Sequence, residues 1–162
     1  MYYETMSIFT ESQRETEEQK KKFRDYFAEK TQDEVQNLEL AEFRADNGVY
    51  QDLNLKSYRP SLWGLIVFCK KEIYYYVAEQ ESYLSFFMKG AGKTEEKLVC
   101  LSQLSDISFS LPHKGPLAFL NPELSRSIEG SYTNMNGTKR YFTLVLNKKA
   151  DEPFALLTNN AK

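Results

Sequence analysis

The segment Gly90-Ala-Gly-Lys-Thr94 contains the lysine–threonine pair that ends many phosphate-binding loops. A complete loop of that kind has the spacing G-x-x-x-x-G-K-[ST]. The position that needs the first glycine is occupied by Phe87, and the residues after Thr94 are typical of a strand rather than a helix. We therefore interpret 90–94 as a turn between two strands, in which the glycines supply the unusual backbone angles, and we expect no nucleotide to bind there.

Few other groups have the types and spacing that catalysis requires. The single histidine, His113, lies between Pro112 and Lys114, and no nucleophile motif such as G-x-S-x-G accompanies it. One histidine and two separated cysteines, Cys69 and Cys100, do not make a zinc-binding set. We interpret both cysteines as buried, reduced side chains. The sequence thus predicts a protein that is not an enzyme and that holds no metal and no cofactor.

The overall composition narrows the classes of protein further. The chain has 162 residues, of which 41% are apolar and 14% aromatic, enough for one globular unit with a core. A net charge of −2, from 21 basic and 23 acidic residues, argues against a nucleic-acid-binding protein. The amino terminus lacks the features of a signal peptide, and the apolar run 65–69 is too short to span a bilayer. These features predict a cytoplasmic protein.

One convincing helix is expected, over residues 10–33. Thr10 is suited to cap it, and the segment is rich in Glu, Gln, Lys and Arg, which favour helices. Phe23, Tyr26 and Phe27 have the i, i+3, i+4 spacing of a narrow apolar stripe, so we expect this stripe to dock the helix on the rest of the protein. We therefore divide the chain into an arm and helix, 1–37, and a β domain, 38–162.

After the helix, apolar residues recur at every second position and turn-forming residues come at short intervals, which is typical of strands. Asn136-Gly137 is the strongest hairpin signal, and the three prolines in 112–124 indicate a loop. The expected strands cover about 38–46, 50–55, 63–69, 72–79, 83–89, 98–101, 104–111, 127–132, 140–146 and 154–158.

The alternation also predicts which side chains point inward. In 72–79, we expect Ile73, Tyr75 and Val77 to face one way, and Tyr74 and Tyr76 the other. The expected inward set consists of large apolar side chains that fill the interior: Leu65, Val67, Ile73, Tyr75, Phe86, Ile107, Phe109, Phe142 and Leu144.

The run Trp63-Gly-Leu-Ile-Val-Phe-Cys-Lys-Lys-Glu-Ile-Tyr-Tyr-Tyr76 resembles the opening hairpin of pleckstrin-homology-like (PH-like) domains of the bacterial and GRAM type. Residues 97–109 resemble the fourth strand of that family, and 140–146 resemble its sixth. The resemblance covers about residues 60–158. It implies a mainly β fold, a partly open antiparallel barrel of about seven strands, here with an N-terminal α-helix.

Two departures from the family pattern affect what the resemblance implies. PH-like domains close one end of the barrel with a carboxy-terminal helix, for which we expect no room after a last strand at 154–158. We therefore expect the helix at 10–33 to cap the sheet instead. Members that bind phosphoinositides carry basic residues spread over the first hairpin loop, whereas this loop is only Cys69-Lys-Lys-Glu72. That activity is not carried over.

The sequence favours a non-enzymatic PH-like module for protein–protein interaction or self-association, with Tyr74 and Tyr76 as a candidate interaction surface. Ordinary packing under the helix is the alternative for both tyrosines. A second hypothesis is weak peripheral binding to an anionic membrane, at about 1 kcal/mol for each lysine near the surface. A third is a barrel that binds a small apolar ligand. The candidate lipid-binding residues of the second hypothesis are Lys70, Lys71, Lys89, Lys93 and Lys97.

Overall fold

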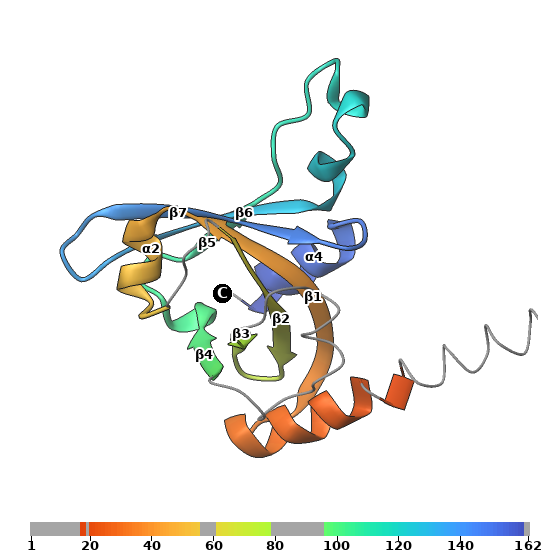
Figure 1. The fold of residues 1–162 in the computed structure, drawn as a ribbon, viewed down its shortest axis with the longest axis vertical. Coiled ribbons are helices and arrows are strands. Elements are labelled where there is room, and N and C mark those ends of the chain that lie inside the picture. The colour runs from red at the N-terminus through yellow and green to blue at the C-terminus, as the bar shows by residue number, and fades with distance from the viewer. Residues whose placement is uncertain (1–16, 19, 56–60, 79–95, 161–162) are drawn as a thin grey trace, which may run out of the picture.

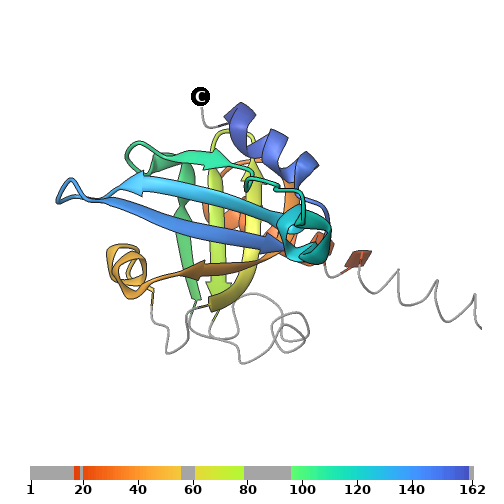
Figure 2. The ribbon, with the colours of Figure 1, turned by 90° about the horizontal axis from the view of Figure 1, so that it is seen from above.

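The computed structural model describes residues 17–18, 20–55, 61–78 and 96–160, and shows a mainly β protein (Figure 1). Seven antiparallel strands form one sheet in the order β4-β3-β2-β1-β7-β6-β5. Their bounds are β1 Val35–Ala45, β2 Ser61–Cys69, β3 Ile73–Ala78, β4 Glu96–Cys100, β5 Ser108–Ser110, β6 Ser127–Thr133 and β7 Lys139–Leu146. The sheet curls into a partly open barrel with β4 and β5 at its two edges (Figure 2), which confirms the predicted fold class.

Strand β1 joins the two halves of the barrel. It pairs with β2 along nearly its whole length, with Leu40 opposite Leu65, and its last five residues also pair with β7, with Phe43 opposite Leu144. An 11-residue strand is long enough to belong to both halves. Because neighbouring strands twist relative to one another, a strand shared in this way turns the sheet back on itself and encloses a core.

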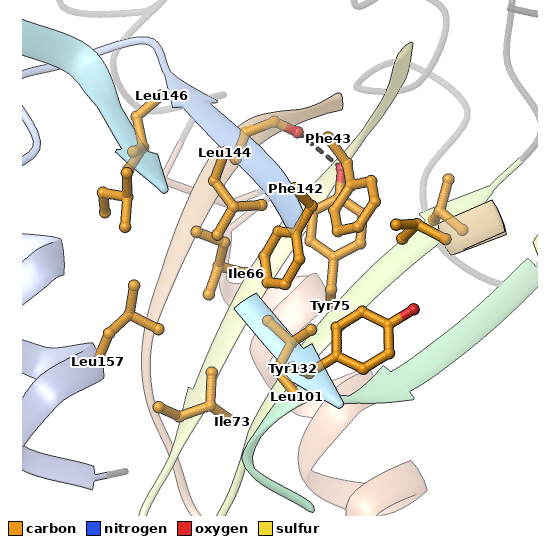
Figure 3. Close-up of a cluster of buried hydrophobic side chains, with 14 of the residues drawn as sticks. Phe43, Ile66, Ile73, Tyr75, Leu101, Tyr132, Phe142, Leu144, Leu146 and Leu157 are labelled. Atoms are coloured by element: carbon orange, nitrogen blue, oxygen red, sulfur yellow. Dashed lines mark hydrogen bonds between the residues drawn. The ribbon is translucent and has the colours of Figure 1, made fainter. Parts of the chain in front are cut away.

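The barrel is filled by an inner cluster of aromatic and aliphatic side chains (Figure 3). The ring of Phe43 stacks on Phe142 with centroids 5.0 Å apart and lies 5.3 Å from the ring of Tyr75. The buried hydroxyl of Tyr75 donates to the carbonyl oxygens of Ala41 at 2.9 Å and Leu62 at 3.2 Å. A Cβ at position 130 would overlap the ring of Phe142, so Gly130 lets the end of that ring approach the backbone of β6. The fully buried members include Phe43, Ile66, Phe68, Ile73, Tyr75, Leu101, Ile128, Leu144 and Leu157.

The chain continues after β7 into a helix, α4 (Asp151–Asn160), so the predicted strand at 154–158 is wrong. Ala150, Phe154 and Leu157 recur at helical spacing; Ala150 and Leu157 are buried in the inner cluster and Phe154 packs against it. Pro153 was interpreted as part of a turn, but a proline in the first helical turn costs no hydrogen bond. The carboxy-terminal helix that we expected to be missing is therefore present.

A second, outer cluster lies between the N-terminal helix, described over 20–31, and the outside of the sheet (Figure 1). Phe23 and Phe27 are buried there, and the ring of Phe27 meets Tyr76 edge-on at 4.8 Å. The docking stripe is thus confirmed, but the helix covers the outer face of β1, β2 and β3 and does not take the place of α4. The other buried members are Leu38, Leu40, Leu65, Val67 and Cys69.

The placement of Leu65 and Val67 corrects the predicted inward set. Ile66 and Phe68 point into the inner cluster, so Leu65 and Val67 face the helix. In a strand buried on both faces, the apolar pattern does not reveal which set points inward, and a choice wrong by one residue reverses every side chain. The predicted alternation in β3 is confirmed, with Tyr75 inside and Tyr76 outside.

The predicted short strand at 50–55 is also wrong, because helix α2 (Asn47–Asp52) follows β1. The side chain of Asp46 accepts a hydrogen bond from the backbone N–H of Val49 at 3.3 Å, which caps the new helix. At its other end the carboxylate of Asp52 accepts from the hydroxyl of Tyr132 at 2.8 Å and from Nε of Arg140 at 3.1 Å. These bonds join α2 to β6 and β7.

The remaining predictions have mixed outcomes. The hairpin at Asn136-Gly137 is confirmed, with Gly137 at φ +81° between β6 and β7. In 104–111 only Ser108–Ser110 is a strand, after a short 3-10 helix, η1 (Leu101–Gln103). The segments 83–89 and 90–94, and Phe86, lie outside the described residues. No helix among the described residues is both long and apolar enough to cross a membrane.

Candidate docking site

The described lysines of the predicted lipid-binding patch do not meet at one end of the sheet. Lys70 and Lys71 are exposed in the turn between β2 and β3. Lys97 is exposed on β4 opposite Val77, four residues along β3 from Ile73 at the turn. At the rise of a strand, that places it roughly 14 Å from the turn. Lys89 and Lys93 lie outside the described residues.

Two acidic residues hold the lysine turn in place, one through its side chain and one through its backbone carbonyl. The backbone N–H of Lys71 donates to the carboxylate of Asp33 at 2.9 Å, and the backbone N–H of Lys70 donates to the carbonyl of Glu34 at 2.8 Å. Glu72 follows immediately in the chain, and the hydroxyl of Ser102 holds the pKa of its carboxyl below the usual value. The turn therefore carries charges of both signs, which weakens its attraction for an anionic surface.

The structure does not offer Tyr76 as an interaction surface. Its side chain is 1% exposed and lies beneath Phe27, so packing under the helix accounts for it. Tyr74 is half-buried and packs against the same outer cluster. Packing under the helix was the alternative that the sequence analysis gave for both tyrosines, and it is confirmed for Tyr76.

A different segment exposes apolar side chains. The connection between β5 and β6 extends away from the barrel along the long axis of the molecule, at the opposite end from the N-terminal helix (Figure 1). Leu117, Phe119 and Leu120 lie on it and are 66%, 76% and 67% exposed. We call these three residues the apolar tip. Single exposed apolar residues are ordinary, whereas three large ones within four positions form a patch that calls for an explanation.

Local hydrogen bonds give the segment around the apolar tip a defined conformation. It consists of two short 3-10 helices, η2 (Ala118–Leu120) and η3 (Pro122–Arg126). The backbone N–H of Leu120 donates to the carbonyl of Leu117 at 3.0 Å, and the side chain of Asn121 accepts from the N–H of Glu123. The apolar tip is therefore displayed on turns and is not simply unfolded chain.

The base of the connection is fastened to the barrel. Arg44 of β1 donates two parallel hydrogen bonds to the carboxylate of Glu123, at 3.0 and 3.1 Å, and a third to Glu42 at 2.6 Å. Arg126 donates to the carbonyl of Leu146 at 3.1 Å. A forked arginine–carboxylate pair fixes orientation as well as distance. We call the Arg44–Glu123 pair the clamp.

The clamp also sets the ionisation of its partners. The guanidinium of Arg44 holds the pKa of Glu123 below its usual value, first by hydrogen bonding and then by charge. Glu123 and Glu42 in turn raise the pKa of Arg44. Both groups are therefore charged at neutral pH, and the clamp is closed there.

The groups that were considered for catalysis lie on different elements of the fold. His113 is exposed on the connection that carries the apolar tip. Burial raises the pKa of the thiols of Cys69 and Cys100, which makes them poor nucleophiles at neutral pH. Cys69 is buried as predicted, whereas Cys100 is only half-buried. No group of three or more metal-ligating side chains occurs within the described ranges.

Sequence reasoning missed the apolar tip, although a signal was present. Residues 112–124 were interpreted as a loop because of their prolines, and Leu117-Ala-Phe-Leu120 is an apolar run inside that loop. Loops lie on the surface, so an apolar run in a predicted loop indicates an exposed apolar patch.

Comparisons with models of protein families, with curated proteins and with solved structures find no match for this chain. Any functional conclusion therefore depends on the site itself.

Proposed function

We propose that the protein is a non-enzymatic PH-like module that binds another cellular component by inserting its apolar tip. The observation that carries the proposal is the joint exposure of Leu117, Phe119 and Leu120 on a connection whose base is held by the clamp. When such a protrusion docks, its apolar surface leaves water, which favours binding. Because its base is already fixed, the segment loses little conformational entropy on binding.

The PH-like assignment is supported by topology. An antiparallel sheet in the order β4-β3-β2-β1-β7-β6-β5, followed by a carboxy-terminal helix, agrees with the resemblance drawn from residues 60–158. The expected lack of a carboxy-terminal helix argued against the resemblance, and the presence of α4 removes this objection. Its position against the inner cluster, through Leu157, matches the closing role of that helix in the family.

The other hypotheses receive less support from the described residues. The lysine patch is divided between the turn after β2 and the start of β4, and acidic groups accompany the turn. The interior contains stacked rings such as Phe43 and Phe142, which favour a filled core over a cavity for an apolar ligand. The interaction hypothesis is kept, with its contact moved from the tyrosines to the apolar tip, and the experiment below decides between a protein and a lipid partner.

A photo-crosslinking experiment tests the proposal without assuming what the partner is. A photoreactive phenylalanine analogue is placed at position 119 or, as a matched control, at Tyr141, which is 65% exposed on β7 away from the apolar tip. In cells that make the protein at its natural level, we expect a discrete protein or lipid adduct from position 119 and none from position 141. The adduct should disappear when Leu117→Ser and Leu120→Ser are combined.

Equal labelling from the two positions would contradict the proposal, because it would mean that the apolar tip meets other molecules only by collision. Circular dichroism of each purified variant should match the wild type, which separates a loss of docking from a loss of fold.

A further inference from the structure

We infer that the component which receives the apolar tip is the interfacial region of a lipid bilayer. The inference rests on the proposed function, since it names the partner of the same site. It concerns insertion of apolar side chains from the β5–β6 connection, and not recognition of a headgroup by the lysine turn after β2.

The shape of the site suits a bilayer. Leu117, Phe119 and Leu120 are each more than three-fifths exposed, and their connection extends along the long axis beyond the barrel (Figure 1). A leaflet can receive such a protrusion without a preformed groove, because its boundary between headgroups and acyl chains accepts apolar side chains a few ångströms deep. Leucine and phenylalanine are side chains that interfacial segments bury there.

The charges beside the apolar tip also suit a bilayer. Residues 111–122 contain His113 and Lys114, both exposed, and no carboxylate. The next acidic residue, Glu123, is held by the clamp. No free carboxylate of this segment would therefore be carried toward the lipid phosphates, and the ammonium of Lys114 can remain at their level while the apolar side chains enter.

The rest of the molecule restricts how it approaches. The whole chain has a net charge of −2, so it is not attracted as a body to an anionic surface. The N-terminal helix is at the far end of the long axis from the apolar tip (Figure 1). Binding is therefore expected with the apolar tip first, driven by apolar burial, with a small contribution from Lys114 and only weak dependence on salt.

Tryptophan fluorescence with brominated lipids tests the inference on the full chain. The wild type contains one tryptophan, Trp63 of β2, which gives the background signal. We compare Phe119→Trp with the matched control Tyr141→Trp, using vesicles of phosphatidylcholine with and without phosphatidylserine. We expect bromine in the acyl chains to quench the added fluorescence of Phe119→Trp and to shift it to the blue, and to leave that of Tyr141→Trp unchanged.

A partition measurement tests the named residues. Combining Leu117→Ser with Leu120→Ser should weaken vesicle binding about tenfold or more, because two buried leucine side chains are lost. Tyr141→Ser, the control, should leave it unchanged. Lys114→Glu should weaken binding several-fold to vesicles that contain phosphatidylserine, and less to phosphatidylcholine alone.

The outcomes separate this inference from the proposed function. Equal quenching of Phe119→Trp and Tyr141→Trp, or no quenching with either type of vesicle, overturns bilayer insertion. If crosslinking from position 119 then gives a protein adduct, the partner is a protein and the proposed function stands. If crosslinking also fails, both are overturned.

Discussion

The inner cluster and the apolar tip are built from the same kinds of side chain but lie in opposite surroundings. In the inner cluster, Phe43 is fully buried and contacts the rings of Phe142 and Tyr75. At the apolar tip, Phe119 is 76% exposed. A buried phenylalanine stabilises the folded state, whereas an exposed one adds almost nothing to it. The contribution of Phe43 to stability therefore explains why a phenylalanine is present at that position. The presence of Phe119 at an exposed position needs another explanation.

The outer cluster is intermediate between these two regions. Its apolar side chains would be exposed if the sheet stood alone, but Phe23 and Phe27 of the N-terminal helix cover them. The chain therefore supplies its own cover for one apolar surface. For the apolar tip, the described residues supply none, which is the contrast that the following predictions examine.

The largest effect on stability is expected in the inner cluster. Phe43→Ala should lower the free energy of unfolding by about 4 kcal/mol, because it removes a fully buried ring and leaves a cavity between Phe142 and Tyr75. Urea denaturation followed by circular dichroism measures this change. Phe43→Leu, which keeps part of the volume, should recover part of the loss. An Ala variant as stable as the wild type would mean that the three rings are not packed as described.

A smaller loss is expected where the helix meets the sheet. Phe27→Ala should lower the free energy of unfolding by about 3 kcal/mol, since Phe27 is fully buried against Tyr76 but lies at the surface of the sheet, where the helix can adjust. Hydrogen exchange should show increased opening of 20–31 before that of β1. If instead both segments opened together, the helix would be an integral part of the barrel core.

The positions of most of the strands in the described sheet could be predicted from the sequence, because alternation and the Asn136-Gly137 turn are local signals. Helix α4 could not be predicted in this way, because Pro153 is equally compatible with a turn and with the first turn of a helix. The contact of this segment with the inner cluster decides between the two. The orientation of β2 failed for a related reason: the strand is apolar on both faces, so only the position of the helix shows which side chains lie inside.

The candidate site was less accessible to prediction than the fold. Tyr74 and Tyr76 were selected because they point away from the inner cluster, but the distance from that face to Phe27 depends on tertiary packing. The tyrosines were expected to be exposed, but Tyr76 is buried. Predicting the apolar tip would have required the opposite inference, namely that an apolar run of the sequence remains exposed. Sequence patterns normally assign such runs to a core, so exposure has to be recognised from the prolines around them.

The clamp should contribute little to stability and should respond to acid. Arg44 and Glu123 are each about two-fifths exposed, so Glu123→Gln is expected to cost about 0.5 kcal/mol at pH 7. Because Arg44 depresses the pKa of Glu123, this contribution is complete above the ordinary glutamate pKa of about 4.3 and is lost as the pH falls through the depressed value.

Unfolding in urea at neutral pH and near pH 3 measures this response. The difference between wild type and Glu123→Gln should become smaller in acid, because the carboxylate of the wild type then takes up a proton. A difference that grew in acid would have the wrong sign for a depressed pKa. A difference that was the same at both pH values would show that the pair does not form in solution.

The smallest effect on stability is expected where the effect on binding is largest. Leu117→Ser combined with Leu120→Ser should change the free energy of unfolding by no more than about 0.5 kcal/mol, because both side chains are two-thirds exposed in the folded protein. The same pair should weaken vesicle binding about tenfold or more. A protein that lost several kcal/mol of stability with this pair would be using the apolar tip as part of its own core, and the contrast with Phe43 would disappear. A protein that kept its stability and lost its binding would show that these leucines act only when a second surface covers them.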